Sequence, residues 1–247
     1  MKYNKIVEGV FISRPNRFIA YVDVNGKTET VHVKNTGRCK ELLTDNAKVY
    51  LSVSDNPSRK TGYDLIAVKK GDLLINMDSQ IPNDVCEEML KKHTIFSENA
   101  IIKREYTYKS SRFDFYIEDG ERRIFLEVKG CTLENNGIAS FPDAPTERGV
   151  KHINELISAT KDGYEAYIVF IIQMKGVTSF RPNDITHKSF GDALRSAYKN
   201  GVKILAYDCK VTPDSIETDN ELRVDLDTLE DIYEQGKRKY YSIRPQS

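Results

Sequence analysis

The sequence lacks any long apolar run. Its longest strongly apolar stretch, YIVFII at 167–172, is far too short to span a bilayer. The first residues, MKYNKIVEGVF, contain no apolar segment of the kind found in a secretory signal. We therefore expect a soluble cytoplasmic protein that does not act at a membrane.

Cysteine is scarce and widely spaced. The four cysteines form no C-x-x-C pair, and no histidine stands near one at the spacing of a metal site. This pattern is typical of reduced cytosolic thiols rather than of a disulfide framework. The positions are Cys39, Cys86, Cys131 and Cys209.

The chain also lacks net charge, because 37 Lys and Arg balance 37 Asp and Glu. No global basic field therefore points to nucleic acid, yet residues 1–80 hold 13 Lys and Arg against 9 Asp and Glu. This mild excess fits a solvated surface as well as a phosphate-binding face. There is no internal repeat or low-complexity segment, and 247 residues with 39% hydrophobic side chains suit two modest domains or one large one.

Short β-prone segments separated by turn residues occupy residues 5–77. Their spacing is typical of an all-β barrel or sandwich. Asn25-Gly26, between alternating runs, is a strong hairpin signal because both residues tolerate positive φ. Two basic loops, 34–40 and 54–62, interrupt the pattern and should lie at the surface. The segments are VEGVFISR, FIAYVDV, TETVHV, KVYLSV, YDLIAV and DLLINM.

The pattern changes at residue 81. We expect a helix over 82–93, strands near 100–108, 112–117 and 122–128, a loop over 131–145, and a helix capped by Thr146 and stopped at Gly163. A strand over 164–174, a helix over 188–201 and a strand over 202–208 follow. This order indicates a mixed sheet flanked by helices, a second domain over 81–224 after a first over 1–80.

Residues 225–247 form an extension with an amphipathic stretch, DLDTLEDIYEQG, and a basic end. Two interpretations are open. In one, the stretch docks as a helix on the second domain, with Leu226, Leu229, Ile232 and Tyr233 on one face. In the other, the cations Lys237, Arg238 and Lys239 contact phosphate.

The segment SRFDFYIEDGERRIFLEVKG, 111–130, places acids inside two β-prone runs that meet at an Asp-Gly turn. Side chains alternate along a strand, so Glu127 and Lys129 share one face, and Phe113 and Phe115 lie opposite Asp114. Pairing counted outward from the turn brings Asp114 abreast of 123–125. A bulge or sheet twist would then be needed to bring the Asp114 and Glu127 carboxylates together.

Two crowded carboxylates are costly unless a cation neutralises them, and oxygen ligands suit Mg²⁺ or Mn²⁺. Beside such a site, the Lys129 ammonium would stabilise charge that develops on a phosphate. The trio of Asp114, Glu127 and Lys129 therefore has the groups for metal-assisted phosphodiester hydrolysis. The competing interpretation is an exposed strand face whose charged side chains pair across strands.

Twelve residues separate Asp114 from the triplet Glu127-Val128-Lys129. This spacing, within this order of elements, resembles the PD-(D/E)XK nuclease superfamily. The segments NTGRCKEL, NPSRKTGY, SRFDFYI, EVKGCTL and FPDAPTERGVKHINEL resemble the sugar fermentation stimulation protein A family. The resemblance implies an α+β protein: an N-terminal OB-like β-barrel followed by an α/β PD-(D/E)XK nuclease-like domain with a mixed central sheet. It also implies DNA binding and regulation of sugar (maltose) metabolism genes.

Carried onto matching positions, the resemblance makes Asp114 and Glu127 metal ligands, with the Val128 carbonyl as a further ligand, and Lys129 the catalytic lysine. Other polar residues are candidates for supporting the acids or touching phosphate, since Arg148 and His152 share one stripe of a helix that follows the loop bearing Asp143. A polar stripe is more often simply solvated. The supporting candidates are Glu88, Asp143, Arg148, His152 and Gln173.

OB-type barrels bind single strands through a basic groove with aromatic platforms. Phe18, Tyr21 and Tyr63 are candidate stacking platforms, although an aromatic residue of a barrel more often belongs to the core, and we give His32 no chemistry. The Arg59 and Lys60 loop is the strongest candidate, because it offers two cations with only Asp55 nearby to neutralise them. The full set of candidate nucleic-acid contacts is Arg14, Arg17, Lys34, Arg38, Lys40, Arg59 and Lys60.

Three functions compete. The first is a Mg²⁺- or Mn²⁺-dependent nuclease acting on DNA, single-stranded DNA or RNA. The second is a DNA-binding regulator that no longer cuts, and the third is a purely structural role. The intact acidic trio favours the first, and the family description favours the second. The sequence selects neither the strand type nor an oligomeric state.

Overall fold

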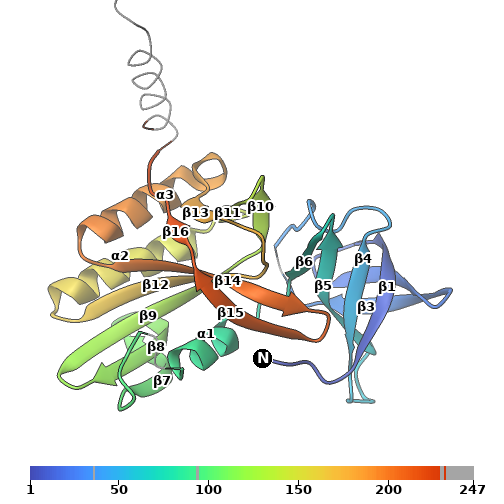
Figure 1. The fold of residues 1–247 in the computed structure, drawn as a ribbon, viewed down its shortest axis with the longest axis horizontal. Coiled ribbons are helices and arrows are strands. Elements are labelled where there is room, and N and C mark those ends of the chain that lie inside the picture. The colour runs from blue at the N-terminus through green and yellow to red at the C-terminus, as the bar shows by residue number, and fades with distance from the viewer. Residues whose placement is uncertain (36, 93–94, 229–230, 232–247) are drawn as a thin grey trace, which may run out of the picture.

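A computed structural model describes the whole chain except residues 36, 93–94, 229–230 and 232–247. Two lobes lie side by side (Figure 1). The first lobe is a barrel built from β1 to β6, and the second, which we call the sheet lobe, runs from α1 to β16. The amphipathic stretch and the three cations at 237–239 expected in the extension fall mostly or wholly outside the described residues.

The barrel confirms the expected OB-like β unit. Its strands run in the order β3-β2-β1-β4-β5-β6, and a parallel pairing of β3 with β5 closes it. Asn25 and Gly26 have φ of 55° and 81°, as the Asn-Gly hairpin requires. The strands are β1 (Ile6–Ser13), β2 (Ile19–Val24), β3 (Lys27–Val33), β4 (Lys48–Val53), β5 (Tyr63–Lys70) and β6 (Leu73–Asn76).

The sheet lobe confirms the expected mixed sheet. Its main sheet has the order β15-β14-β12-β9-β8-β7, in which β9, β12 and β14 are parallel and the other neighbours antiparallel. Its elements are α1 (Pro82–Leu90), β7 (Ile101–Tyr108), β8 (Ser111–Asp119), β9 (Arg122–Cys131), β10 (Leu133–Asn135), β11 (Ile138–Phe141), α2 (Glu147–Lys161), β12 (Glu165–Ile172), β13 (Ser179–Pro182), α3 (Asp184–Lys199), β14 (Lys203–Thr212), β15 (Ser215–Glu221) and β16 (Arg223–Val224).

Helices cover both faces of this sheet (Figure 1). One apolar cluster joins Leu156 of α2 and Leu194 of α3 to Phe125 of β9, and another joins Val85 of α1 to Leu126 of β9. The strand β12 lies between them with almost all of its side chains buried. This is why its sequence is a continuous apolar run instead of an alternating one.

The segment 131–145 is not the plain loop that the sequence predicts. It contains the hairpin β10–β11, which joins β13 and β16 in a second, four-stranded sheet. Asn136 and Gly137 form its turn with φ of 51° and 77°. These strands have two to four residues each, too few for an alternating pattern to stand out.

The register of the β8–β9 hairpin corrects the expected one. Asp119 pairs with Arg122 across a two-residue turn, so Phe115 pairs with Leu126. Asp114 lies one residue beyond the last of these pairs, where its carboxylate reaches the Val128 N–H on β9. Gly120, with φ of 64°, supplies the positive φ that such a tight turn requires at its first central residue.

Phe113 and Phe115 were expected on one face, and the structure places them on two. Phe113 belongs to the apolar cluster of α2, whereas Phe115 belongs to the cluster of α1. The pairing between β7 and β8 is interrupted opposite Asp114, where Glu105 has φ of 54°. This local irregularity breaks the strict alternation of side chains.

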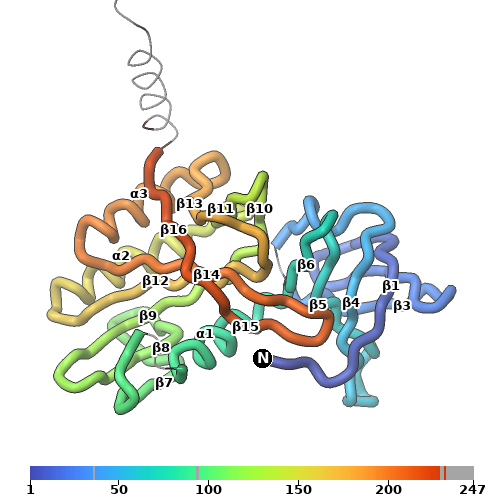
Figure 2. The backbone as a smooth tube through the Cα atoms, viewed as in Figure 1, coloured from blue at the N-terminus to red at the C-terminus, as the bar shows by residue number. Residues whose placement is uncertain are grey.

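The two lobes are joined by a buried polar network. Asn76 donates to the Tyr3 hydroxyl at 3.0 Å, and the Gln173 amide donates to Asn76 Oδ1 at 3.1 Å and to the Asp78 carbonyl at 3.0 Å. The first residues of the chain run beside the β14–β15 hairpin (Figure 2), where Lys2 bridges to Ser215. Buried polar groups that are hydrogen-bonded in this way hold the lobes in one arrangement.

All four cysteines are free and buried. Burial raises the pKa of each thiol above its usual range. Within the described residues, no helix has the length and apolar character needed to cross a membrane.

Candidate active site

Two carboxylates from neighbouring strands define the site. Asp114 on β8 accepts a hydrogen bond from the Val128 backbone N–H on β9 at 2.7 Å, and its other oxygen accepts one from the Asn83 amide at 2.8 Å. Asn83 lies in the first turn of α1, whose start at Pro82 packs against Gly130 of β9. A side chain at position 130 would collide with Pro82 and Gln173, so this glycine allows α1 to approach the site.

Glu127 is 4% exposed and has two very different oxygens. Its Oε1 lies 2.5 Å from Lys129 Nζ and 2.5 Å from His152 Nδ1. Its Oε2 is buried without a hydrogen-bond partner among the described residues. A buried carboxylate oxygen is costly when unpartnered, so Oε2 is the atom from which a further ligand would gain most.

The two acids respond differently to these surroundings. Burial first, and then the negative charge of Glu127, raise the pKa of Asp114 above its usual range, against the opposing Val128 N–H. Burial alone would also raise the pKa of Glu127, but the Lys129 ammonium and the hydrogen bond from His152 outweigh it and lower that pKa. Glu127 therefore has neutralising partners, whereas Asp114 has two neutral donors.

The helix α2 supplies His152 and Arg148. Thr146 caps it, as expected, by accepting from the Gly149 N–H at 3.1 Å. His152 is buried against Glu127, and Arg148 lies one turn earlier with its Nε 3.4 Å from His152 Nε2. The structure thus brings both helix candidates to the acids.

These residues line a hollow of about 370 Å³, which also includes Lys129. Within the described part of the chain, no three His, Cys, Asp or Glu side chains stand together as a ready metal cage. Two carboxylates and a backbone carbonyl are nevertheless enough for Mg²⁺, because this ion keeps several of its waters. The orphaned Glu127 oxygen beside Asp114 fits such a hard cation.

Three of the expected supporting residues lie elsewhere. Glu88 is half exposed, pairs with the Met1 ammonium at 2.5 Å and does not line the hollow. Asp143 and Gln173 line a second hollow that adjoins the first. Gln173 is 1% exposed and is held by the network between the lobes, so it positions neighbours instead of facing the acids.

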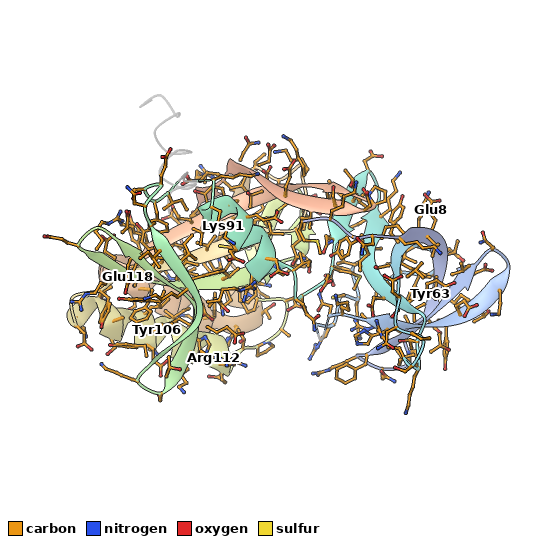
Figure 3. All side chains as sticks on the ribbon, turned by 90° about the horizontal axis from the view of Figure 1, so that it is seen from below. Glu8, Tyr63, Lys91, Tyr106, Arg112 and Glu118 are labelled. Atoms are coloured by element: carbon orange, nitrogen blue, oxygen red, sulfur yellow. The ribbon has the colours of Figure 1, made fainter. Side chains whose placement is uncertain are left out.

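Sequence reasoning missed several residues of the hollow. Asn83 was not among the candidates, although its amide is a direct partner of Asp114. Arg112, two residues before Asp114, also lines the hollow and pairs with Glu105 at 3.3 Å. Figure 3 shows Arg112 near Tyr106 on the sheet lobe. Positions 112 and 114 are two residues apart on one strand, so alternation of side chains could have indicated that Arg112 lies on the same face as Asp114.

Three expected phosphate contacts are committed to protein partners. Arg14 donates to backbone carbonyls that include those of Arg17 and Arg38. Lys34 pairs with the fully buried Asp78 at 2.7 Å. Arg59 makes a two-pronged pair with Asp64 at 2.6 and 2.9 Å, so the expectation that only Asp55 stands near it is wrong. Asp64, five positions further along the chain at the start of β5, neutralises it.

Four other barrel cations are exposed: Arg17, Arg38, Lys40 and Lys60. None of the four has a hydrogen bond or ion pair from its side chain within the described residues. Arg17 lines the second hollow. Arg14 donates hydrogen bonds to the backbone carbonyls of both Arg17 and Arg38, which holds these two residues close together. Lys60 follows the paired Arg59 in the β4–β5 loop, which ends at Tyr63. Figure 3 shows Tyr63 well away from Arg112 at the site.

Two of the three aromatic candidates of the barrel, Phe18 and Tyr21, lie at the surface and not in the core. Phe18 is 56% exposed and Tyr21 is 39% exposed. Tyr21 alternates with the buried Ala20 and Val22 on β2, so its ring points out of the barrel. Phe18 directly precedes β2 and follows the exposed Arg17 in the chain.

Two family models match the chain in order. The model described as the SfsA N-terminal OB domain matches residues 12–77, and the one described as the sugar fermentation stimulation protein RE domain matches residues 80–215. The sugar fermentation stimulation protein homolog of Clostridium beijerinckii is 60% identical over 216 residues, covering 87% of this chain and 96% of that protein. The homolog of Ruminiclostridium cellulolyticum is 58% identical over 226 residues, covering 92% and 100%.

A solved structure agrees with these matches. The structure of Pyrococcus furiosus SfsA in complex with Ca²⁺ has a TM-score of 0.80 and 29% sequence identity, covering 91% of this chain and 98% of that chain. Both lobes therefore have counterparts along almost the whole length of known relatives. On these grounds the chain belongs to the SfsA family of sugar fermentation stimulation proteins.

Proposed function

We propose that this protein is a nuclease that hydrolyses phosphodiester bonds of nucleic acid with the help of Mg²⁺ or Mn²⁺. The observation that carries the proposal is Glu127 Oε2, a buried carboxylate oxygen without a partner in the described structure, beside Asp114 in a polar hollow. The related Pyrococcus furiosus protein was solved with Ca²⁺, a divalent ion with the same preference for oxygen ligands.

Asp114, Glu127 and the Val128 carbonyl would hold the metal. When bound, the metal would polarise the phosphate and lower the pKa of a water molecule. The chain's own residues keep its ligands in place, since Asn83 and the Val128 N–H orient Asp114 and His152 orients Glu127. Such positioning partners commonly contribute about 10- to 100-fold in metal affinity or activity.

Lys129 and Arg148 would act on the phosphate. The Lys129 ammonium lies against Glu127 on the same face of β9, where it can donate to a phosphate oxygen as negative charge develops. Arg148 is exposed at the rim of the hollow, where its guanidinium can bind a second phosphate oxygen. The acids repel the substrate, and these two cations offset that repulsion.

A DNA-binding regulator of sugar (maltose) metabolism genes is the second candidate. The name shared by the relatives, sugar fermentation stimulation protein, describes an effect on fermentation and no cleavage. Exposed Arg17 and Arg38 on the barrel would serve a regulator as well as a nuclease. We assign either activity to the cytoplasm, where free thiols stay reduced.

Cleavage is tested with end-labelled single-stranded DNA, duplex DNA and RNA. We expect Mg²⁺ or Mn²⁺ to support cutting of at least one substrate, and EDTA to stop it, because the two carboxylates need a cation to act. If no substrate is cut with either ion while salt-sensitive binding is clear, the regulator is the better description.

The barrel's contribution is tested by two matched double variants. We expect Arg17→Ala with Arg38→Ala to weaken binding to a labelled strand about tenfold and to reduce the salt dependence, since each phosphate contact releases counterions. Arg59→Ala with Lys60→Ala removes the same charge from the loop beside Tyr63. Fluorescence anisotropy at several salt concentrations compares the affinities of the two variants. A larger loss of affinity in the second variant would place the main nucleic-acid contact in that loop instead.

A further inference from the structure

A second hollow of about 340 Å³ continues from the site along β9. Gly130 and Thr132 line it directly after Lys129, and both hollows share Ser79, Phe141 and Thr146 as walls. Gly130 lies three positions along the strand from Glu127, a distance of about 10 Å. A phosphate in the first hollow and a base in the second can therefore belong to the same or adjacent nucleotides.

The barrel closes this second hollow. Arg17, Asn35 and Gly37 from the barrel face residues 140–146 of the sheet lobe. Asn35 is fixed, because its amide donates to the Met77 carbonyl at 2.8 Å and its Oδ1 accepts from the Gly37 N–H at 2.7 Å. The hollow thus exists only where the two lobes meet, and its walls are held before any ligand arrives.

The lining suits a flat, neutral ring better than a phosphate. Phe141, Pro142 and Leu133 supply apolar surface, and among the described lining residues Arg17 is balanced by Asp143. The Asp143 carboxylate has no hydrogen bond or ion pair within the described residues. It lies against Gly37, where an added Cβ would stand 2.5 Å from its Oδ2. A carboxylate at this position accepts hydrogen bonds and repels anions.

We propose that this hollow receives one unpaired nucleobase that carries an amino group, next to the phosphate held at Asp114 and Glu127. Cytosine, adenine and guanine have such an amino donor for Asp143, whereas thymine and uracil have only a ring N3–H flanked by two carbonyl oxygens, which a carboxylate repels. A base inside a duplex cannot enter without leaving the stack, so the substrate is single-stranded or has one flipped base. The inference rests on the proposed function, because it places a base of that same substrate.

Binding of two labelled ten-nucleotide strands, oligo(dC) and oligo(dT), tests the inference by fluorescence anisotropy in EDTA, where no strand is cut. We expect wild-type protein to bind oligo(dC) about tenfold more tightly, the value of one hydrogen bond to a charged group. In Asp143→Asn this ratio should fall close to one, because a carboxamide both donates and accepts. Asp72→Asn, an exposed carboxylate in the turn between β5 and β6, should leave the ratio unchanged.

Gly37→Ala tests the same contact from the other lobe. Its Cβ would displace the Asp143 and Asn35 side-chain oxygens, so the ratio should fall in this variant as well. A preference for oligo(dC) that both variants remove supports the inference. Equal affinities in the wild type, or a preference that survives Asp143→Asn, overturn it while leaving the nuclease proposal intact. Failure of the wild type to bind either strand also overturns the inference, and the cleavage test on duplex DNA and RNA then decides the nuclease proposal separately.

Discussion

Replacing Asp114 with Asn is expected to lower the rate of metal-dependent cleavage by about 10³-fold or more. The amide keeps the shape of the side chain but removes the charge that would hold a divalent cation beside Glu127. Binding of the strand should survive, because the exposed barrel cations are unchanged. Cleavage is measured under single-turnover conditions, and calorimetric titration of the wild type and the variant with Mn²⁺ reports metal binding independently of cutting.

Glu118→Gln is the matched control for this variant. It makes the same carboxylate-to-amide change on the same strand, where Glu118 forms a surface pair with Lys103 at 3.1 Å. Such a pair contributes only about 0–1 kcal/mol to stability, so cleavage should be unaffected. Equal metal affinity in wild type and Asp114→Asn would show that the cation is held elsewhere, and the proposed chemistry would fall with it.

Replacing Phe125 with Ala should destabilise the protein by about 3–5 kcal/mol, the cost of a large cavity in a core. Phe125 is 1% exposed on β9, and four aromatic rings lie with their centroids 4.8–5.3 Å from its own. Those rings belong to Tyr108, Phe113, Tyr116 and Tyr164. Because they bind the β7–β8 hairpin to β9, the loss also loosens the strands that hold Asp114 and Glu127.

Urea denaturation followed by circular dichroism measures this loss as a lower midpoint. Phe125→Leu keeps most of the volume and should cost less than about 1.5 kcal/mol. Tyr106→Ala, which removes a 42% exposed ring stacked on Tyr116, should also cost far less than the buried change. A Phe125→Ala variant as stable as Tyr106→Ala would mean that this cluster does not support the sheet.

The hairpin shows how far local rules reach. The Asp-Gly signal correctly predicted a turn between β8 and β9, and strand alternation correctly put Glu127 and Lys129 on one face. The register was counted wrongly because the loop was taken to be longer than Gly120 and Glu121. A two-residue turn pairs Asp119 with Arg122 and Phe115 with Leu126, so Asp114 comes within reach of the Val128 N–H.

The second hairpin was missed although it carries the same signal as the first. Asn136-Gly137 forms a tight turn just as Asn25-Gly26 does. Its flanking strands have three and four residues and are only partly apolar, so no alternating pattern marked them. Strands this short are stabilised by the partners they pair with, here β13, and partners distant in sequence leave no local trace.

Charges on the barrel show a different limit. Arg14, Lys34 and Arg59 look like free cations in sequence, and each is engaged by a group 5 to 44 positions away. Such pairing decides which cations remain available to bind phosphate. A side chain whose N–H groups already donate to a carboxylate or to backbone carbonyls has few donors left. The exposure of Phe18 likewise depends on the fold, because this residue lies at the end of the loop between β1 and β2 on the barrel surface.

The sequence by itself determined the order of elements, the barrel followed by a mixed sheet, and the identity of the acids and lysine on one hairpin. These follow from alternation, capping and turn chemistry, which act between near neighbours along the chain. Only the tertiary structure decided that Asn83 hydrogen-bonds to Asp114 and His152 to Glu127. It also decided that Glu88 lies away from the acids and that Asp143 faces a hollow between the lobes. Packing of distant segments sets those contacts, and no local pattern encodes the distance between two side chains that folding brings together.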